Sequence, residues 1–209
     1  MPKYFIDTEF IEGFHKPLFG KKRHFIDLIS IGIVCEDGRT FSAISSEYDY
    51  KDSDPWVKQN VLLPLYSKTV NGDNRNRYDV HNFNKHYGLP NHLIKSKMAL
   101  FFGCYETQLY WNAPVGIEVY AYYADYDWVL FCSLFGRMID LPKGFPMYCR
   151  DLKQTFDDKI APAEIRAIGY DAAVERLKKK TGYPVQKDEH NALADAKWNL
   201  DLYRFLQTF

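Results

Sequence analysis

Residues 4–10 read Tyr-Phe-Ile-Asp-Thr-Glu-Phe, an apolar, β-prone stretch interrupted by two acids. In a strand alternate side chains share a face, so Asp7 and Glu9 point the same way as Phe5. Neighbouring anions on a buried strand are very unfavourable unless a positive charge lies between them, and a divalent cation meets that need best. We therefore interpret Asp7 and Glu9 as metal ligands on a central strand.

Chain length and charge set the first limits on function. The chain has 209 residues, enough for a full hydrophobic core, and we expect a single domain over residues 1–209. Lys plus Arg and Asp plus Glu both number 27, so the formal net charge is zero. Such a chain does not hold long nucleic acid by bulk electrostatics, so any nucleic-acid contact should be short.

The cysteines and the N-terminus indicate the compartment. Cys35, Cys104, Cys132 and Cys149 are widely spaced among apolar neighbours and form no CxxC pair. This pattern is typical of buried free thiols in a reducing compartment. The N-terminus lacks the basic and then apolar pattern of a signal peptide, and no apolar run reaches the length of a membrane span. We expect a cytoplasmic protein with no membrane contact.

The first part of the chain predicts a three-stranded antiparallel meander. Residues 25–35 are rich in β-branched side chains, and Asp37-Gly38 is a hairpin turn signal before a third strand at residues 39–46. Residues 11–24 are expected to form a loop or an extension of the first hairpin.

The middle of the chain predicts two helices and a long connection. Asp54-Pro55 is typical of an N-cap followed by proline at the first helical position, so we expect a helix over residues 55–63 that Pro64 ends. Residues 68–90 are polar and without period, which predicts a long connection. Residues 92–111 carry apolar side chains at helical spacing and predict a helix.

The rest of the chain completes an α/β pattern. It predicts a strand at residues 117–123, a helix at residues 125–135 closed by Gly136, and a short fifth strand at residues 146–150. Further helices are predicted at residues 151–159, 170–181 and 189–208. These elements predict a mixed five-stranded sheet flanked by helices. Handedness rules place the strand at residues 117–123 parallel to the opening strand and beside it.

Two further acids and a histidine are expected at the same edge of the sheet. Asp125 and Asp127 follow the strand predicted to lie next to the opening one, and one of them is expected to cap the helix that begins there. Asp195 stands five residues after His190, a spacing that separates two helical side chains by about 140°. Both can reach the sheet edge if His190 lies on a loop or in the first turn.

Four carboxylates and one histidine are the groups that a two-metal phosphodiester hydrolase requires. Two hard cations about 4 Å apart take oxygen ligands; one lowers the pKa of the attacking water and the other stabilises the leaving oxygen. Asp7 would bridge both ions. Glu9, Asp127 and Asp195 would complete the ligand shells. A histidine with its ordinary pKa of about 6.5 suits proton abstraction at neutral pH, so His190 is the expected general base.

In this order, and over nearly the whole chain, the motifs resemble the DEDD exonuclease superfamily in its histidine subclass. The residues that carry the resemblance are Asp7-Thr-Glu9, Tyr126-Asp127, and His190 with Asp195. Segments 5–12, 27–34 and 124–128, the last followed by Leu134-Phe-Gly136, resemble more closely a compact 3′-to-5′ exoribonuclease family found in mycobacteria and bacteriophages. The resemblance assigns the third ligand to Asp127, because the family places its acid directly after the residue matching Tyr126.

The resemblance implies a ribonuclease H-like fold and a centre with two divalent cations, Mg²⁺ or Mn²⁺. It also implies release of nucleoside 5′-monophosphates from a 3′ end, often by a homodimer. We expect the substrate to be single-stranded RNA or a 3′ overhang of RNA. The chain is longer than the compact family pattern at residues 14–23 and 68–90.

Other interpretations stay open. The same motifs would serve an exonuclease on single-stranded DNA, because the metals read phosphate and only a contact to the 2′-hydroxyl distinguishes the sugars. A module that binds a 3′ end without hydrolysing it is the alternative outside enzymes. Structurally, Asp7 and Glu9 could face solvent at a strand edge, and His190 could be a capping or core histidine.

Residues 68–87 interleave basic and aromatic side chains that could clamp an RNA strand. These are Arg75, Arg77, Tyr78, His81, Phe83, Lys85, His86 and Tyr87. Stacking and phosphate contacts would hold the strand, and a solvated surface loop is the other interpretation. Phe10 could stack on the terminal base, but a core position is the preferred prediction.

Overall fold

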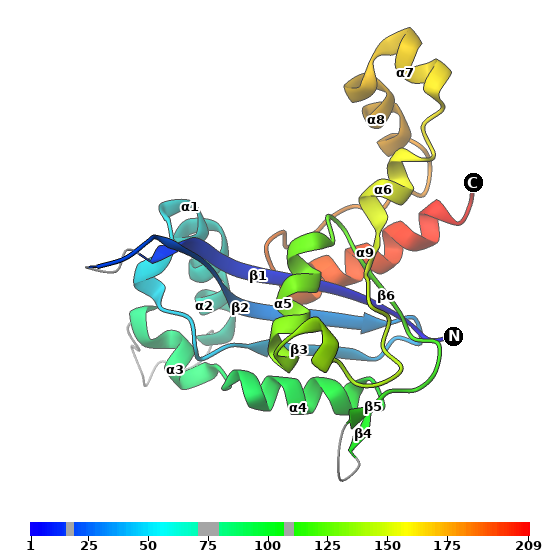
Figure 1. Ribbon diagram of the computed structural model, residues 1–209. Coiled ribbons are helices and arrows are strands. Elements are labelled where there is room, and N and C mark those ends of the chain that lie inside the picture. The colour runs from blue at the N-terminus through cyan, green and yellow to red at the C-terminus, as the bar shows by residue number, and fades with distance from the viewer. Residues whose placement is uncertain (16–18, 71–79, 107–110) are drawn as a thin grey trace.

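The computed structural model describes residues 1–15, 19–70, 80–106 and 111–209. Within these ranges one sheet contains five strands. They are β1 (Lys3–His15), β2 (Arg23–Cys35), β3 (Thr40–Ile44), β6 (Glu118–Ala121) and β7 (Arg150–Asp151). Their order across the sheet is β3-β2-β1-β6-β7, which places β1 in the middle (Figure 1).

The pairing of the strands confirms the predicted mixed sheet. β1 pairs antiparallel with β2, and β2 with β3. β6 lies parallel to β1, with Tyr120 opposite Phe5, and β7 lies parallel to β6. The first hairpin stays paired as far as His15 and Arg23, so residues 11–15 extend β1. This five-stranded sheet flanked by helices is consistent with a ribonuclease H-like fold.

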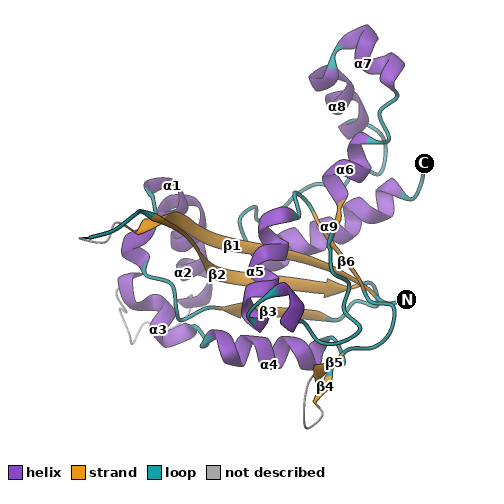
Figure 2. Ribbon diagram, viewed as in Figure 1, coloured by secondary structure: helices purple, strands orange, loops and turns teal. Residues whose placement is uncertain are grey.

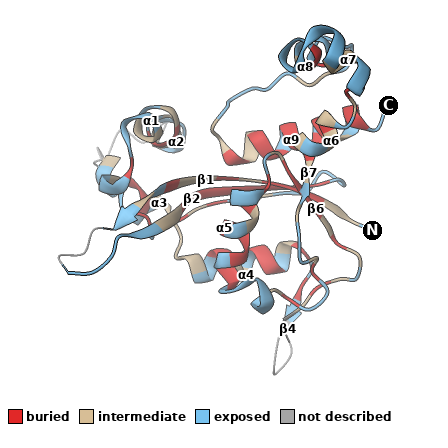
Figure 3. Cartoon of the chain, turned by 45° about the horizontal axis from the view of Figure 1, so that its top comes forward, coloured by how far each residue is buried: buried red, intermediate tan, exposed pale blue. Residues whose placement is uncertain are grey.

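The two faces of β1 belong to two different core clusters. Ile6 is fully buried with side chains of α4 (Asn91–Phe101) and α5 (Asp125–Phe135). Phe5, its neighbour in sequence, is fully buried on the other face with side chains of α9 (Ala192–Leu206). Helices therefore cover both faces of the central strand (Figure 3).

The prediction that Pro64 ends a helix was wrong. The helical segment runs on through α1 (Pro55–Val57), a π-helical turn η2 (Lys58–Leu62) and α2 (Leu63–Val70). In the π-helical turn the Leu63 N–H bonds the Lys58 carbonyl oxygen, five residues back. Pro64, which has no N–H, stands where the bonding pattern passes from π to α, so the missing donor does not break the helix.

The connection predicted over residues 68–90 is partly helical. α2 reaches Val70, and a 3₁₀ turn η3 (Val80–Asn82) leads into α3 (Phe83–Tyr87). Phe83 is 1% exposed, so it belongs to the core and not to an RNA clamp. Arg75, Arg77 and Tyr78 lie outside the described residues.

The helix predicted over residues 92–111 ends at Phe101. Gly103 follows with φ of +77°, the left-handed conformation that commonly terminates helices. A short hairpin of β4 (Tyr105–Glu106) and β5 (Trp111–Asn112) comes next. The predicted helix was too long because apolar residues continue at helical spacing beyond Gly103, although the helix has already ended there.

Short helices complete the chain (Figure 2). They are η1 (Tyr50–Asp52), η4 (Met138–Asp140), α6 (Leu152–Asp157), α7 (Pro162–Ile168) and α8 (Tyr170–Lys178). α6, α8 and α9 confirm the three C-terminal helices with shifted ends, whereas α7 was not predicted. α7 and α8 stand away from the sheet (Figure 1).

The fifth strand is shorter than the segment predicted for it. β7 occupies Arg150–Asp151, at the end of the predicted segment 146–150.

Three cysteines are buried and Cys149 is partly buried, and all four are free thiols, as predicted. No helix in the described part of the chain is long and apolar enough to cross a membrane.

Candidate active site

β1 presents Asp7 and Glu9 on the face that carries α9. Phe5, two residues before Asp7, is fully buried and stacks on Tyr120 of β6, with ring centroids 5.3 Å apart. Because alternate side chains share a face, this packing sets the direction of both carboxylates. β6 pairs with β1 only as far as Phe5, but both acids are partly buried, so the interpretation as a solvent-facing strand edge is wrong.

The close approach of α9 to the sheet depends on Gly32. This residue lies opposite Asp7 on β2. A Cβ atom at position 32 would fall 2.2 Å from the carbonyl oxygen of Ala192, the first residue of α9. The side-chain amide of Asn199 donates a 2.9 Å hydrogen bond to the Ile6 carbonyl oxygen and ties α9 to β1. Glycine at this position lets the start of α9 rest on the strands.

Asp195 holds the loop that precedes α9. Its Oδ1 accepts a hydrogen bond from Gln186 Nε2 and its Oδ2 one from the His190 N–H, both at 2.8 Å. The Asn191 side chain caps the helix by accepting from the Ala194 N–H at 3.1 Å. His190 therefore lies on the loop just before the helix, the placement that the five-residue spacing required.

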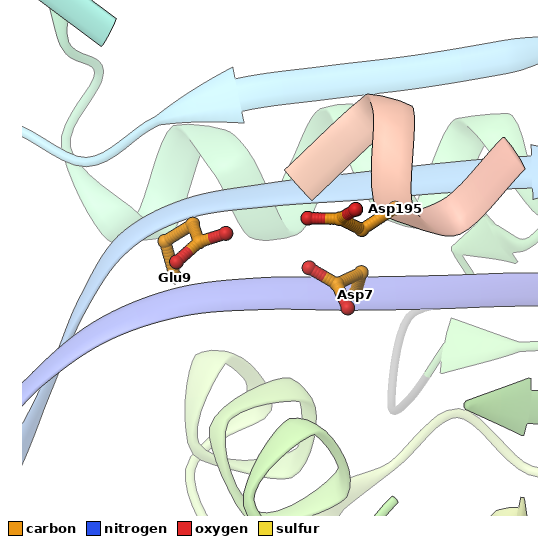
Figure 4. A group of neighbouring side chains, drawn as sticks. All are labelled: Asp7, Glu9 and Asp195. Atoms are coloured by element: carbon orange, nitrogen blue, oxygen red, sulfur yellow. The ribbon is translucent and has the colours of Figure 1, made fainter. Parts of the chain in front are cut away.

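The carboxylates of Asp7, Glu9 and Asp195 converge (Figure 4). Each offers one oxygen, and these oxygens all lie within 4.8 Å of one another. Carboxylate oxygens are the ligands that Mg²⁺ and Mn²⁺ prefer in proteins. Asp7 and Glu9 are neighbours on β1, whereas Asp195 comes from α9 near the other end of the chain, so the cluster forms only when the chain folds.

Asp127 reaches the site from α5. It is 7% exposed, and its Oδ1 accepts 2.7 Å hydrogen bonds from both the N–H and the hydroxyl of Thr8. Its carboxylate is not part of the group of three. Asp125 is exposed. The prediction that one of these aspartates caps α5 was wrong: the chain is already helical at Ala124, so both lie inside the first turn.

His190 lies at the rim of the site with a left-handed backbone, φ +63°. Its ring meets Trp56 of α1 edge-on, with ring centroids 4.8 Å apart and an interplanar angle of 78°. The residue is partly exposed, so the interpretation as a core histidine is wrong. Its backbone N–H, and not its ring, makes the hydrogen bond to Asp195.

All five predicted residues line one depression of about 330 Å³, here called the acidic hollow. Its lining residues are Asp7, Thr8, Glu9, Phe10, Tyr122, Tyr123, Tyr126, Asp127, Gln186, His190, Asp195, Trp198 and Asn199. In the described part of the chain this lining includes no Lys or Arg. Phe10 is partly buried and stacks on Tyr126, with centroids 5.2 Å apart, so it is only partly the core residue that was predicted.

Burial and mutual repulsion disfavour the ionised forms of these acids. Burial first, and then the charges of the three neighbouring acids, hold the pKa of Asp7 well above its usual range. Burial, followed by the charges of Asp195 and Asp127, raises the pKa of Glu9 to about 8. Burial raises the pKa of Asp127 to about 7 against the opposing hydrogen bonds from Thr8. Among the residues that the structure describes, no lysine or arginine lines the hollow that holds the cluster, and the all-oxygen donor set fits a hard divalent cation.

Several residues that shape the site were not found from the sequence. Thr8 positions Asp127 from 119 residues away in the chain, and Gln186 fixes Asp195 from an irregular loop. Trp56 contacts His190 from a separate helix. Gln186 and Trp56 lie outside the motifs, and Thr8 stands between the two acids of the first motif without having been given a role there.

The fold and the acid cluster together are consistent with a ribonuclease H-like nuclease. No family model matches the chain. Among curated proteins, the chain is similar to 3′-5′ exoribonucleases of Mycobacterium tuberculosis from the strains CDC 1551 and H37Rv. Each is 30% identical over 207 residues, which cover 98% of this chain and 92% of the relative. The chain therefore belongs to the family of these mycobacterial 3′-5′ exoribonucleases.

Proposed function

We propose that this protein is a metal-dependent 3′-5′ exoribonuclease. It hydrolyses single-stranded RNA or a 3′ overhang to nucleoside 5′-monophosphates. The observation that carries the proposal is the convergence of three carboxylates in a chain whose relatives are named 3′-5′ exoribonucleases. A homodimer, a cytoplasmic location and a single domain stay predictions.

Two divalent cations, Mg²⁺ or Mn²⁺, fit the donor set of the acidic hollow. Asp7 would bridge them, with Glu9 and Asp195 beside it in the cluster. Asp127 would contribute a carboxylate ligand from α5. Its Oδ1 accepts both hydrogen bonds from Thr8. When bound, the cations would lower the pKa of the attacking water and stabilise the leaving oxygen.

The histidine would act as the general base. His190 lines the acidic hollow, and Asp195 holds its backbone. An imidazole ring that lines the hollow would be placed to accept a proton from the attacking water. Because Asp195 fixes the loop and also belongs to the carboxylate cluster, it would position His190 relative to the residues that would hold the cations.

The test compares RNA and DNA oligonucleotides of one sequence, labelled at the 5′ end and incubated with Mn²⁺. Wild-type protein should shorten the RNA from its 3′ end and release 5′-monophosphates. Asp7→Asn should abolish this, and His190→Ala should cost roughly 10²- to 10⁴-fold in rate. Full activity in Asp7→Asn would refute the mechanism, and a loss below about tenfold would remove His190 from its role.

The same assay separates the competing functions. Faster digestion of the DNA strand than of the RNA strand would move the substrate to single-stranded DNA. Absence of turnover with either cation, together with retained binding of the RNA, would favour a module that only holds a 3′ end.

A further inference from the structure

A tyrosine with an unfavourable backbone conformation lies on the wall of the acidic hollow. Tyr123 stands in the turn between β6 and α5 and has φ of +56°. Positive φ is rare for a bulky side chain, and glycine or asparagine adopts it more easily. A tyrosine at this position therefore works against the local backbone.

The same conformation recurs around the hollow. In the described part of the chain, the non-glycine residues with positive φ are Tyr123, Asp188 and His190. Asp188 and His190 belong to the loop that Asp195 holds. Backbone strain in proteins clusters at functional sites, where surrounding contacts maintain it. Because the other non-glycine residues with positive φ lie in the loop beside the hollow, we relate the conformation of Tyr123 to the site and not only to the turn that contains it.

Packing in the core does not explain why a tyrosine occupies position 123. Tyr123 is 63% exposed, whereas Tyr122 before it is partly buried and packs edge-on against Trp198 of α9. Two contacts orient the exposed ring: Tyr122 meets it edge-on at 4.8 Å, and Lys153 Nζ lies 5.9 Å from its centroid. The ring is thus held in place and remains accessible from the hollow.

We propose that Tyr123 is a substrate-contacting residue whose ring stacks on a nucleobase near the 3′ end of the bound strand. This inference rests on the proposed function, because the strand must reach the acid cluster. Every base has a π face, so such a contact strengthens binding without selecting a sequence. The side chain is kept at a strained position because the substrate, and not the core, uses it.

The test uses two variants and a matched control. Tyr123→Phe keeps the ring, and Tyr123→Asn removes it while suiting the left-handed backbone. Tyr148→Asn is the control, because Tyr148 is 58% exposed and lies outside the lining of the hollow. With Mn²⁺ and a single-stranded RNA pentanucleotide, Tyr123→Asn should raise KM about tenfold or more. Tyr123→Phe and the control should stay within about twofold of wild type, and Tyr123→Asn should melt no lower than wild type.

A second readout reports stacking without turnover. An RNA pentanucleotide with a phosphorothioate terminal linkage carries 2-aminopurine at one of its last two positions. Its fluorescence should be quenched by wild type and by Tyr123→Phe, and much less by Tyr123→Asn. Lack of RNA hydrolysis by the wild type would refute the proposed function. The quenching of 2-aminopurine fluorescence would still show whether the Tyr123 ring stacks on a base.

Three results would overturn the inference. Tyr123→Asn could melt several degrees lower with an unchanged KM, which would make the ring structural. Tyr123→Phe could lose as much affinity as Tyr123→Asn, which would assign the contact to the hydroxyl. Equal quenching by all variants would show that no base stacks on this ring.

Discussion

Asp7 is the residue on which the proposed chemistry depends most. It belongs to the carboxylate cluster, and three other acids raise its pKa in addition to burial. In the metal-free protein this arrangement opposes folding, because a like-charged group must either stay protonated or repel its neighbours. The acid cluster therefore lowers the stability of the metal-free protein, and the proposed cations would offset this cost when bound.

The metal-free protein should lose stability as pH rises from about 4.5 to about 8. The pKa of Glu9 is about 8 in the folded protein, above its usual value of 4.5. Between these values the folded state binds more protons than the unfolded state, so the free energy of unfolding falls with rising pH. Asp7 and Asp127 are shifted in the same direction. Thermal unfolding in EDTA across this pH range checks the prediction.

Asp7→Asn is the control for that measurement, because it removes one of the repelling charges. It should flatten the pH dependence and melt higher than wild type in EDTA near pH 8. Mn²⁺ should raise the melting temperature of wild type more than that of the variant. A wild type that is more stable in EDTA near pH 8 than near pH 5 would contradict the account.

A matched pair of aspartates on α5 tests whether Asp127 is a metal ligand, as proposed. Asp125 and Asp127 share the first turn of α5, but only Asp127 is buried and lines the acidic hollow. Asp127→Asn should lower exonuclease kcat about a hundredfold or more, since even weaker second-layer contacts to metal ligands are worth 10- to 100-fold. Asp125→Asn should stay within about twofold of wild type. Equal effects of the two substitutions on kcat would remove Asp127 from the site.

At the scale of elements, Gly32 decides how α9 meets the sheet. Gly32→Ala would place a methyl group against the backbone of Ala192, which cannot move as a side chain would. We expect a loss of about 1–3 kcal/mol of stability, as for other overpacked contacts. RNA hydrolysis should also fall at least about tenfold, because α9 carries Asp195 and a displacement near 1 Å is costly in catalysis.

Gly38 supplies the control at the neighbouring turn. It has φ of +93°, and a Cβ atom there would meet nothing within 4 Å. Gly38→Ala should therefore lower stability through backbone strain while leaving hydrolysis unchanged. If Gly32→Ala retains full activity, the contact between α9 and β2 does not set the geometry of the site.

Elements with a strong pattern could be predicted from the sequence. The meander and the helix at residues 125–135 follow from β-branched runs, the Asp37-Gly38 turn and a closing glycine. The continuation past Pro64 could not be foreseen, because it depends on a π-helical turn. α7 was missed because its side chains lie largely at the surface and its seven residues are too few to show a helical period.

At the scale of the molecule, the fold collects one site from three distant segments. β1, α5 and α9 contribute Asp7, Asp127 and Asp195 respectively. The order and spacing of these acids could be read from the sequence, together with the parallel pairing of β1 and β6. The supporting hydrogen bonds could not, because partners such as Thr8 and Asp127 meet only after the chain has folded.

The charge of the whole chain predicts a shallow salt dependence of RNA binding. Lys plus Arg equal Asp plus Glu at 27 each, so binding should neutralise few phosphates. For about three phosphates on a single strand, log K should fall with log salt with a slope of about −2. Fluorescence anisotropy over about 50 to 200 mM salt measures this slope. A slope steeper than about −5 would indicate an extended basic surface instead.

Anomalous diffraction from crystals grown with millimolar Mn²⁺ would locate the cations that the proposed chemistry requires. We expect anomalous peaks in the acidic hollow, with oxygens of Asp7, Glu9 and Asp195 about 2 Å from the metal positions. Crystals with free access to Mn²⁺ and no peak within reach of these carboxylates would contradict the proposed chemistry.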